Sequence, residues 1–126
     1  MLGIVCDVGH TIITDSVMNI ILNSIGRTDA MEKLYDESIF KDMSQDNIDK
    51  TIRDICIKKG DCIKGMPLQD IKQYCDQVTK TPGLLEFIGY VKKNNIPILF
   101  IGAVPVFITE YLLTSVGVDL TNDKNI

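Results

Sequence analysis

Two kinds of hydrophobic pattern alternate along this chain of 126 residues. Residues 2–6 (LGIVC) and 96–102 (IPILFIG) are short, continuous apolar runs. Such runs are typical of strands that are buried on both faces of a sheet. Elsewhere apolar residues recur every three to four positions, which is the spacing of amphipathic helices. The pattern therefore predicts a mixed α/β chain whose first strand ends at Asp7.

Helical spacing is found in six segments of the sequence. They cover residues 15–26, 28–40, 44–60, 66–78, 81–95 and 105–117. Ser16 or Asp15 is the expected cap of the first helix and Gly26 its end, whereas Ser44 and Gly60 bound the third. The inward-facing positions predicted from the spacing are Val17, Ile20, Ile21, Ile25, Met31, Leu34, Tyr35, Ile39, Ile48, Ile52, Ile55, Cys56, Leu68, Ile71, Tyr74 or Cys75, Val78, Leu85, Ile88, Val91, Phe107, Tyr111, Leu112 and Val116.

The order of the elements predicts a parallel α/β core with a helical insert. The first four helices follow one another without a strand, after which a helix, the second strand, another helix and a third strand beginning at residues 118–120 are expected. In such sheets ligands bind beyond the carboxyl ends of the strands. That rule brings Asp7 together with residues 102–104, and the start of the helix at Pro105 offers N–H groups to an anion.

Composition and charge narrow the classes of function. The net charge of −4 and the absence of a long Lys/Arg run disfavour a nucleic-acid partner. The sequence contains no run of about 18 apolar residues, so no membrane span is predicted. The N-terminus lacks the basic region of a signal peptide, so we expect a cytoplasmic protein without a membrane partner.

The cysteines and the paired lysines have ordinary structural interpretations. The four cysteines and the single histidine lack the close spacing of a zinc site. Cys6 is expected in the core, and Cys56 and Cys75 on inward helix faces. Lys58 and Lys59 are expected to be solvated charges near a helix end.

Two stretches of the sequence resemble the haloacid dehalogenase (HAD) superfamily, and within it the phosphoserine phosphatases. They are IVCDVGHTIITDS at residues 4–16, and residues 65–119, which contain TPG at 81–83, EY at 110–111 and a closing GVD. The resemblance implies a partial Rossmann-like core formed by residues 1–14 and 80–126. It also implies a helical cap of residues 15–79, inserted after the first strand.

The resemblance assigns roles to residues at both strand ends. Asp7 matches the nucleophile, which forms an aspartyl-phosphate and binds Mg²⁺, and Thr11 matches the threonine of the same motif. Gly9 replaces the general acid–base aspartate and keeps only the backbone carbonyl that binds the metal. Gly102 replaces a phosphate-binding Ser or Thr, next to the amides of Ala103 and Val104. General acid–base catalysis typically contributes about 10²–10⁴-fold, so its loss at Gly9 is severe.

His10 and Lys59 are the remaining candidates. His10 either shuttles a proton in place of the missing aspartate or is a loop residue that supplies a hydrogen bond. A cap arginine that recognises the substrate carboxylate has no clear match, and Lys58 or Lys59 is the nearest cation, Lys59 being the candidate for substrate binding. Two further motifs of the family have no match in residues 1–126: the lysine of the third motif and the acidic residues of the fourth.

Three hypotheses of function follow from the sequence. The first is a degenerate HAD-like domain that binds a phosphorylated small molecule with little or no hydrolysis, in effect a pseudoenzyme with a weak Mg²⁺ site. The second is an interaction module that forms homo-oligomers through an exposed sheet edge, since an uncovered edge favours pairing. The third is an active Mg²⁺-dependent phosphatase that uses Asp7 and receives the missing groups from a partner chain.

Overall fold

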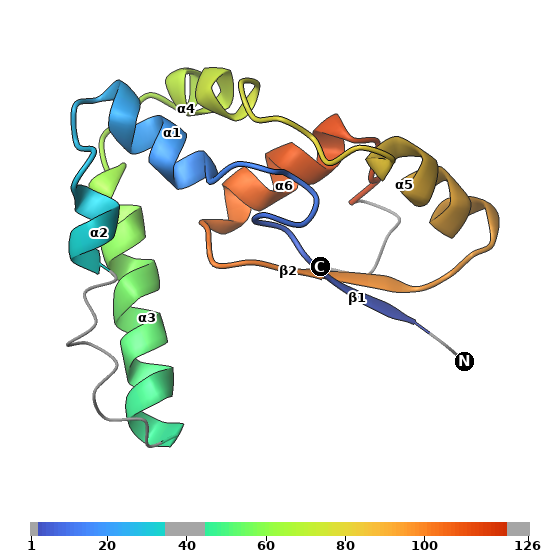
Figure 1. Cartoon of the computed structure of the whole chain (residues 1–126), viewed down its shortest axis with the longest axis horizontal. Helices are drawn as coiled ribbons and strands as arrows, with labels where there is room; N and C mark the ends of the chain where they lie inside the picture. The colour runs from blue at the N-terminus through green and yellow to red at the C-terminus, as the bar shows by residue number, and fades with distance from the viewer. Residues whose placement is uncertain (1–2, 35–44, 121–126) are drawn as a thin grey trace.

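The computed structural model describes residues 3–34 and 45–120 (Figure 1). It is a mixed α/β chain with a parallel two-stranded sheet, as the sequence predicts. The elements are β1 (Ile4–Asp7), α1 (Val17–Ser24), α2 (Ala30–Leu34), α3 (Gln45–Cys62), α4 (Leu68–Cys75), α5 (Leu84–Lys93), β2 (Ile98–Ile101) and α6 (Val106–Ser115). The predictions for Tyr35, Ile39 and Ser44 lie outside the described residues, as does the side chain of Met31.

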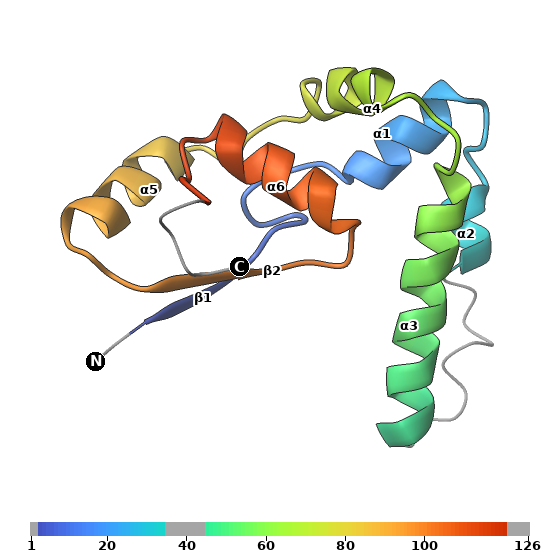
Figure 2. The same cartoon turned by 180° about the vertical axis from the view of Figure 1, so that it is seen from behind.

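The sheet is covered on one face only. Ile4 pairs with Ile98 and Asp7 with Ile101, so both strands end at the same edge, where the site was predicted. Figures 1 and 2 show α5 and α6 on one side of the strands and no described element on the other. Phe100 points to the covered side and is 5% exposed, whereas Val5 on the opposite face is 67% exposed. The expectation that both strands are buried on both faces is therefore wrong within the described residues.

The segment after α6 is not a strand in the described residues. Gly117 turns the chain with a φ of +86°. The N–H of Val118 then donates to the carbonyl of Leu113 at 3.1 Å, and the Val118 side chain is buried. This N–H satisfies a carbonyl at the end of the helix and is not available to a sheet, so the third strand predicted at residues 118–120 is corrected.

The helical insert, α1 to α4, stands between β1 and α5 in sequence and extends to one side of the sheet (Figures 1 and 2). Ser16 caps α1 by accepting a hydrogen bond from the N–H of Asn19 at 3.3 Å, as predicted, and Gly26 follows the helix with a φ of +74°. In contrast, α3 runs past Gly60 and ends at Cys62. A single glycine inside a helix costs only about 1 kcal/mol, which so long a helix tolerates.

The core is continuous between the insert and the sheet helices. Its largest fully buried side chains are Ile12, Met18, Ile21, Leu22, Ile108, Leu113, Val8 and Val17. The predicted inward positions that are confirmed as buried are Val17, Ile21, Leu34, Ile55, Ile71, Cys75, Val78, Ile88, Val91, Leu112 and Val116. Those that are exposed instead are Ile25, Ile52, Cys56, Leu68, Leu85 and Phe107. In α3 the buried face was assigned to the wrong residues. Ile55 and Lys59, which are four positions apart and so lie on one side of the helix, are buried, whereas Ile52 and Cys56 are exposed.

The two connections between the insert and the core are hydrogen-bonded to each other. The N–H of Thr14 donates to the carbonyl of Thr79 at 2.9 Å, and the N–H of Thr79 donates to the Asp15 carboxylate at 2.8 Å. The N–H of Thr81 donates to the carbonyl of Ile12 at 3.0 Å. These bonds fix the start of the insert against its end, directly beside the loop that follows Asp7.

In the described part of the chain, no helix combines the length and the apolar character that crossing a membrane requires.

Candidate functional site

Asp7 is presented at the end of β1 by a tightly turned loop. The N–H of Val8 donates to the carbonyl of Ile101 at 3.0 Å, which extends the pairing one residue beyond the strand. The side chain of Val8 is buried, and its carbonyl accepts from the N–H of Ile12 at 3.1 Å. The Thr11 hydroxyl donates to Asp7 Oδ2 at 3.1 Å. The threonine predicted to belong to this motif thus orients an exposed carboxylate.

A cavity of about 500 Å³ opens in front of Asp7. Its walls come from the loop after β1, the start of α1, α3, the loop after β2, and α6. The lining residues are Asp7, Val8, Gly9, His10, Ile13, Ser16, Val17, Asn19, Lys59, Ala103, Val104 and Leu112. The structure therefore brings Asp7, Gly9, His10, Lys59, Ala103 and Val104 of the sequence prediction to one cavity. Ser16 and Asn19 line it as well, although the sequence pattern indicates only a capping role for Ser16 and none for Asn19.

Lys59 lies inside this cavity and not in solvent. Its side chain is only 4% exposed, and Nζ donates a hydrogen bond to the carbonyl of Ala103 at 3.0 Å. The expectation of a solvated helix-end charge is thus wrong for Lys59, whereas Lys58 beside it is exposed as predicted. The signal for this position was its spacing of four residues from the buried Ile55.

The His10 side chain contacts the backbone of its own loop. Its backbone has a positive φ of +57°, which is uncommon for a residue with a side chain. Its Nδ1 lies 3.2 Å from the carbonyl of Thr14. Since a carbonyl only accepts, a hydrogen bond here requires a proton on Nδ1, and in the neutral ring Nε2 is then the acceptor. The contact agrees with the loop-anchoring interpretation of His10.

The two glycines at the strand ends are not required by crowding. A Cβ added at Gly9 meets nothing within 4 Å. A Cβ added at Gly102 lies 3.5 Å from Val8 Cβ, an ordinary contact, and 3.9 Å from the hydroxyl oxygen of Thr109. A Cβ fits both positions, so the space around them does not require glycine at either. Thr109, a buried residue that sequence analysis missed, brings a hydroxyl near Gly102.

The described residues do not by themselves fit a magnesium ion. Mg²⁺ takes about six oxygen ligands in near-octahedral geometry. In the part of the chain that the structure describes, no group of three or more His, Cys, Asp or Glu side chains can hold a metal. The cavity offers the carboxylate of Asp7 and the carbonyl of Gly9, while the Asp15 carboxylate is bonded to the Thr79 N–H.

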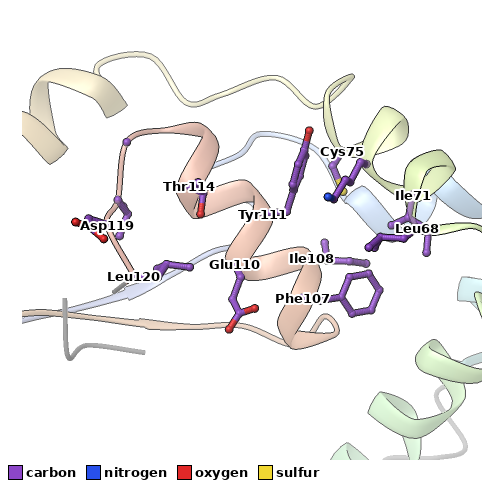
Figure 3. Close-up of a pocket in the computed structure, with 13 residues that line it drawn as sticks. Leu68, Ile71, Cys75, Phe107, Ile108, Glu110, Tyr111, Thr114, Asp119 and Leu120 are labelled. Atoms are coloured by element: carbon purple, nitrogen blue, oxygen red, sulfur yellow. The ribbon is translucent and has the colours of Figure 1, made fainter. Parts of the chain in front are cut away.

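A larger cavity, of about 650 Å³, lies away from Asp7 between α4, α6 and residues 117–120 (Figure 3). Two of its lining side chains are held by neighbours: the Tyr111 hydroxyl donates to Asp76 Oδ1 at 2.8 Å, and Lys72 Nζ lies 5.5 Å from the centre of the Tyr111 ring. Desolvation by burial raises the pKa of Cys75 to about 11, so its thiol stays protonated near neutral pH and is a poor nucleophile. Much of the remaining lining of this second cavity is apolar, and the lining does not include Asp7.

In sequence, no protein-family model and no curated protein matches the chain.

Solved structures identify the fold. A HAD family hydrolase from Salmonella enterica serovar Typhi superposes with a TM-score of 0.68 at 19% identity, over 92% of this chain and 38% of that chain. The chain therefore has the HAD-like fold. A second solved structure is that of a phosphoserine phosphatase with an analogue of its phospho-aspartyl intermediate. It superposes with a TM-score of 0.61 at 16% identity, over 92% of this chain and 52% of that chain. The chain thus spans about two-fifths to half of the proteins it resembles.

Proposed function

We propose that this chain is a phosphoserine-phosphatase-like HAD domain that binds a phosphorylated small molecule at Asp7 and hydrolyses it very slowly or not at all. The observation that carries the proposal is the convergence of Asp7, Lys59 and the loop at Ala103 on one cavity, with the Asp7 carboxylate held by the Thr11 hydroxyl. These groups come from segments far apart in the sequence, and a packed core does not need them together. The four free cysteines fit the reducing cytoplasm as its location.

The similarity to a phosphatase structure supports the role of Asp7. In that phosphatase the solved state is an analogue of a phospho-aspartyl intermediate. Asp7 ends β1 with its carboxylate exposed and held by Thr11, an arrangement that suits attack on a phosphoryl group. The Ala103 and Val104 amides, at the end of the neighbouring strand, are the proposed backbone donors to that group.

Slow turnover follows from the groups that are lost. Gly9 has no side chain to protonate the leaving group, and general acid–base catalysis typically contributes about 10²–10⁴-fold. Gly102 supplies no hydroxyl donor to the phosphoryl oxygens. The described oxygen donors at Asp7 are also too few for a tight magnesium site. His10 Nε2 is the remaining basic atom for a slow reaction, and we propose loop anchoring as its main role.

The test is phosphate-ester hydrolysis with the purified chain. The wild type and Asp7→Asn are incubated with magnesium and a panel of phosphomonoesters that includes phosphoserine, and binding of orthophosphate is followed by NMR titration. We expect saturable phosphate binding and a release rate that differs little between the two proteins. Fast hydrolysis that disappears in Asp7→Asn would contradict the degenerate assignment and favour an active phosphatase. An absence of phosphate binding in the wild type would overturn the proposal itself.

Restoring the lost acid is a second test of the same site. The space at Gly9 accepts a side chain, so Gly9→Asp is expected to fold like the wild type. If the missing acid limits turnover, hydrolysis by Gly9→Asp rises above that of the wild type, by up to about 10²–10⁴-fold. Adding Asp7→Asn to this variant is the control, and it abolishes any gained activity. A gain that survives the control excludes Asp7 as the nucleophile.

The uncovered sheet supports a second candidate function, self-association with another copy of the chain. Val5, Leu99 and Ile101 form an apolar patch on the bare face, and they are 67%, 43% and 49% exposed. β1 has no strand partner on its outer edge among the described residues, so two copies can pair their β1 edges about a two-fold axis. Three partly exposed aliphatic side chains fall short of the roughly 800 Å² per partner of stable interfaces. Concentration-dependent association in sedimentation is expected, and a monomer at all concentrations would exclude this function.

A further inference from the structure

We propose that Lys59, carried by the helical insert, is the cation that recognises the phosphoryl group of the ligand at Asp7. The inference rests on the proposed function, because it names the residue that makes this cavity selective for an anion. It assigns the charge of the site to α3, in the insert, and not to the α/β core that carries Asp7.

The position of Lys59 is the first argument. Its neighbour Lys58 is exposed, but Lys59 is almost fully buried and directs its ammonium at the carbonyl of Ala103. This bond places the ammonium at the wall of the cavity, beside the loop that follows β2 and on the same cavity as Asp7.

The charge balance of the cavity is the second argument. A phosphomonoester carries close to two negative charges at neutral pH, and Asp7 would repel it. Of the residues that line the cavity, all of which the structure describes, Lys59 is the only lysine or arginine. An ammonium has three N–H donors, so the bond to the Ala103 carbonyl does not exclude a bond to an anion. A cation at this place offsets the repulsion between the ligand and Asp7.

The walls of the cavity define the class of ligand. About 500 Å³ is at the lower end of the range for small-molecule sites. Away from Asp7 and Lys59 the walls are largely aliphatic, and His10, Ser16 and Asn19 add the remaining polar side chains. We therefore assign the site to a compact phosphomonoester with a small, partly apolar body. Binding of its phosphoryl group to Lys59 would tie α3 to the core through the ligand.

The test compares two adjacent lysines. Lys59→Met keeps the aliphatic chain and removes the charge, and Lys58→Met makes the same change at an exposed position of the same helix. Orthophosphate affinity is measured by NMR titration, with sulfate and acetate as further anions and circular dichroism as the check of folding. We expect Lys59→Met to weaken phosphate binding at least about tenfold, equivalent to about 1.4 kcal/mol, and Lys58→Met to change it less than about twofold. Lys59→Arg keeps the charge and is expected to retain most of the affinity.

The outcomes separate this inference from the proposed function. If the wild type binds phosphate and Lys59→Met binds it equally well, Lys59 is not the recognition residue although the phosphate site stands. Acetate binding as strong as phosphate binding would also overturn the inference, because the site would then be selective for a carboxylate. If Lys59→Met does not fold, the wild type is labelled with ¹³C at the lysine Cε carbons and its NMR spectrum is recorded with and without phosphate. The Lys59 signal is the one that is missing from the spectrum of Lys59→Arg. A Lys59 signal that shifts on phosphate addition supports the inference, and one that stays fixed while phosphate binds overturns it.

Discussion

The two faces of the β1–β2 sheet carry similar residues and have different environments. On one face Ile98 and Phe100 are buried under α5 and α6, and on the other Val5, Leu99 and Ile101 are substantially exposed. The chemical difference between the faces is small, since all five side chains are apolar. A continuous apolar strand therefore shows that both faces suit burial, and the described chain provides a cover for only one.

The covered face also determines where the candidate site lies. The helix α5 leads into β2, and α6 follows β2. The loop of Ala103 joins β2 to α6 at the carboxyl edge of the sheet, so α6 starts just after it. The insert reaches the same edge from the side through Lys59. The site thus depends on packing at the covered face, whereas the bare face contributes no residue to the cavity except Asp7 at its end.

The largest difference between the faces is expected in stability. Phe100→Ala removes a buried aromatic side chain and should lower the free energy of unfolding by about 3–5 kcal/mol. Leu99→Ala, the adjacent change on the bare face, should cost about 1 kcal/mol or less, because Leu99 is already 43% exposed. Urea denaturation of the two variants measures both values. Equal losses would mean that the bare face is covered in solution.

The opposite faces of β1 can be compared through thiol chemistry. Cys6 is half-buried on the covered face, and burial, followed by the nearby charge of Asp7, raises the pKa of its thiol. A cysteine placed by Val5→Cys would lie on the bare face, one residue away. Because the thiolate is the reactive form, the new cysteine should react with iodoacetamide at least about tenfold faster than Cys6.

Mass spectrometry of the alkylated peptides at mildly alkaline pH measures these rates. The exposed Cys56 serves as the internal reference for an accessible thiol, and the buried Cys75 as the slow limit, since its pKa is raised to about 11. Reaction of Val5→Cys as slow as that of Cys6 would contradict an open face at β1.

The comparison also shows what the sequence could and could not predict. The shared strand edge of Asp7 and residues 102–104 was predictable, because parallel strands align their carboxyl ends. The capping by Ser16 and the turn at Gly26 were predictable because they depend on neighbouring residues. The contact of Lys59 with the core was not predictable, because the Ala103 carbonyl to which it donates lies 44 residues away, and only its spacing of four residues from Ile55 indicated its burial. The exposure of one face of the sheet was not predictable either, because the hydrophobic pattern indicates only whether a residue suits burial and not whether another element covers it.

The smallest effect on stability is expected from charging the bare face. The double variant Val5→Lys/Leu99→Lys places two cations on exposed positions, so its free energy of unfolding should stay within about 0.5–1 kcal/mol of the wild type. Its effect on association should be much clearer, because two copies that pair through this face would bring like charges together and lose apolar contact. Sedimentation velocity over a concentration series compares the variant with the wild type. Glu86→Lys, which raises the net charge by the same two units at an exposed position outside the patch, is the control for altered net charge. An unchanged concentration dependence in the double variant would mean that any self-association uses another surface of the molecule, and that two copies do not pair through the bare face.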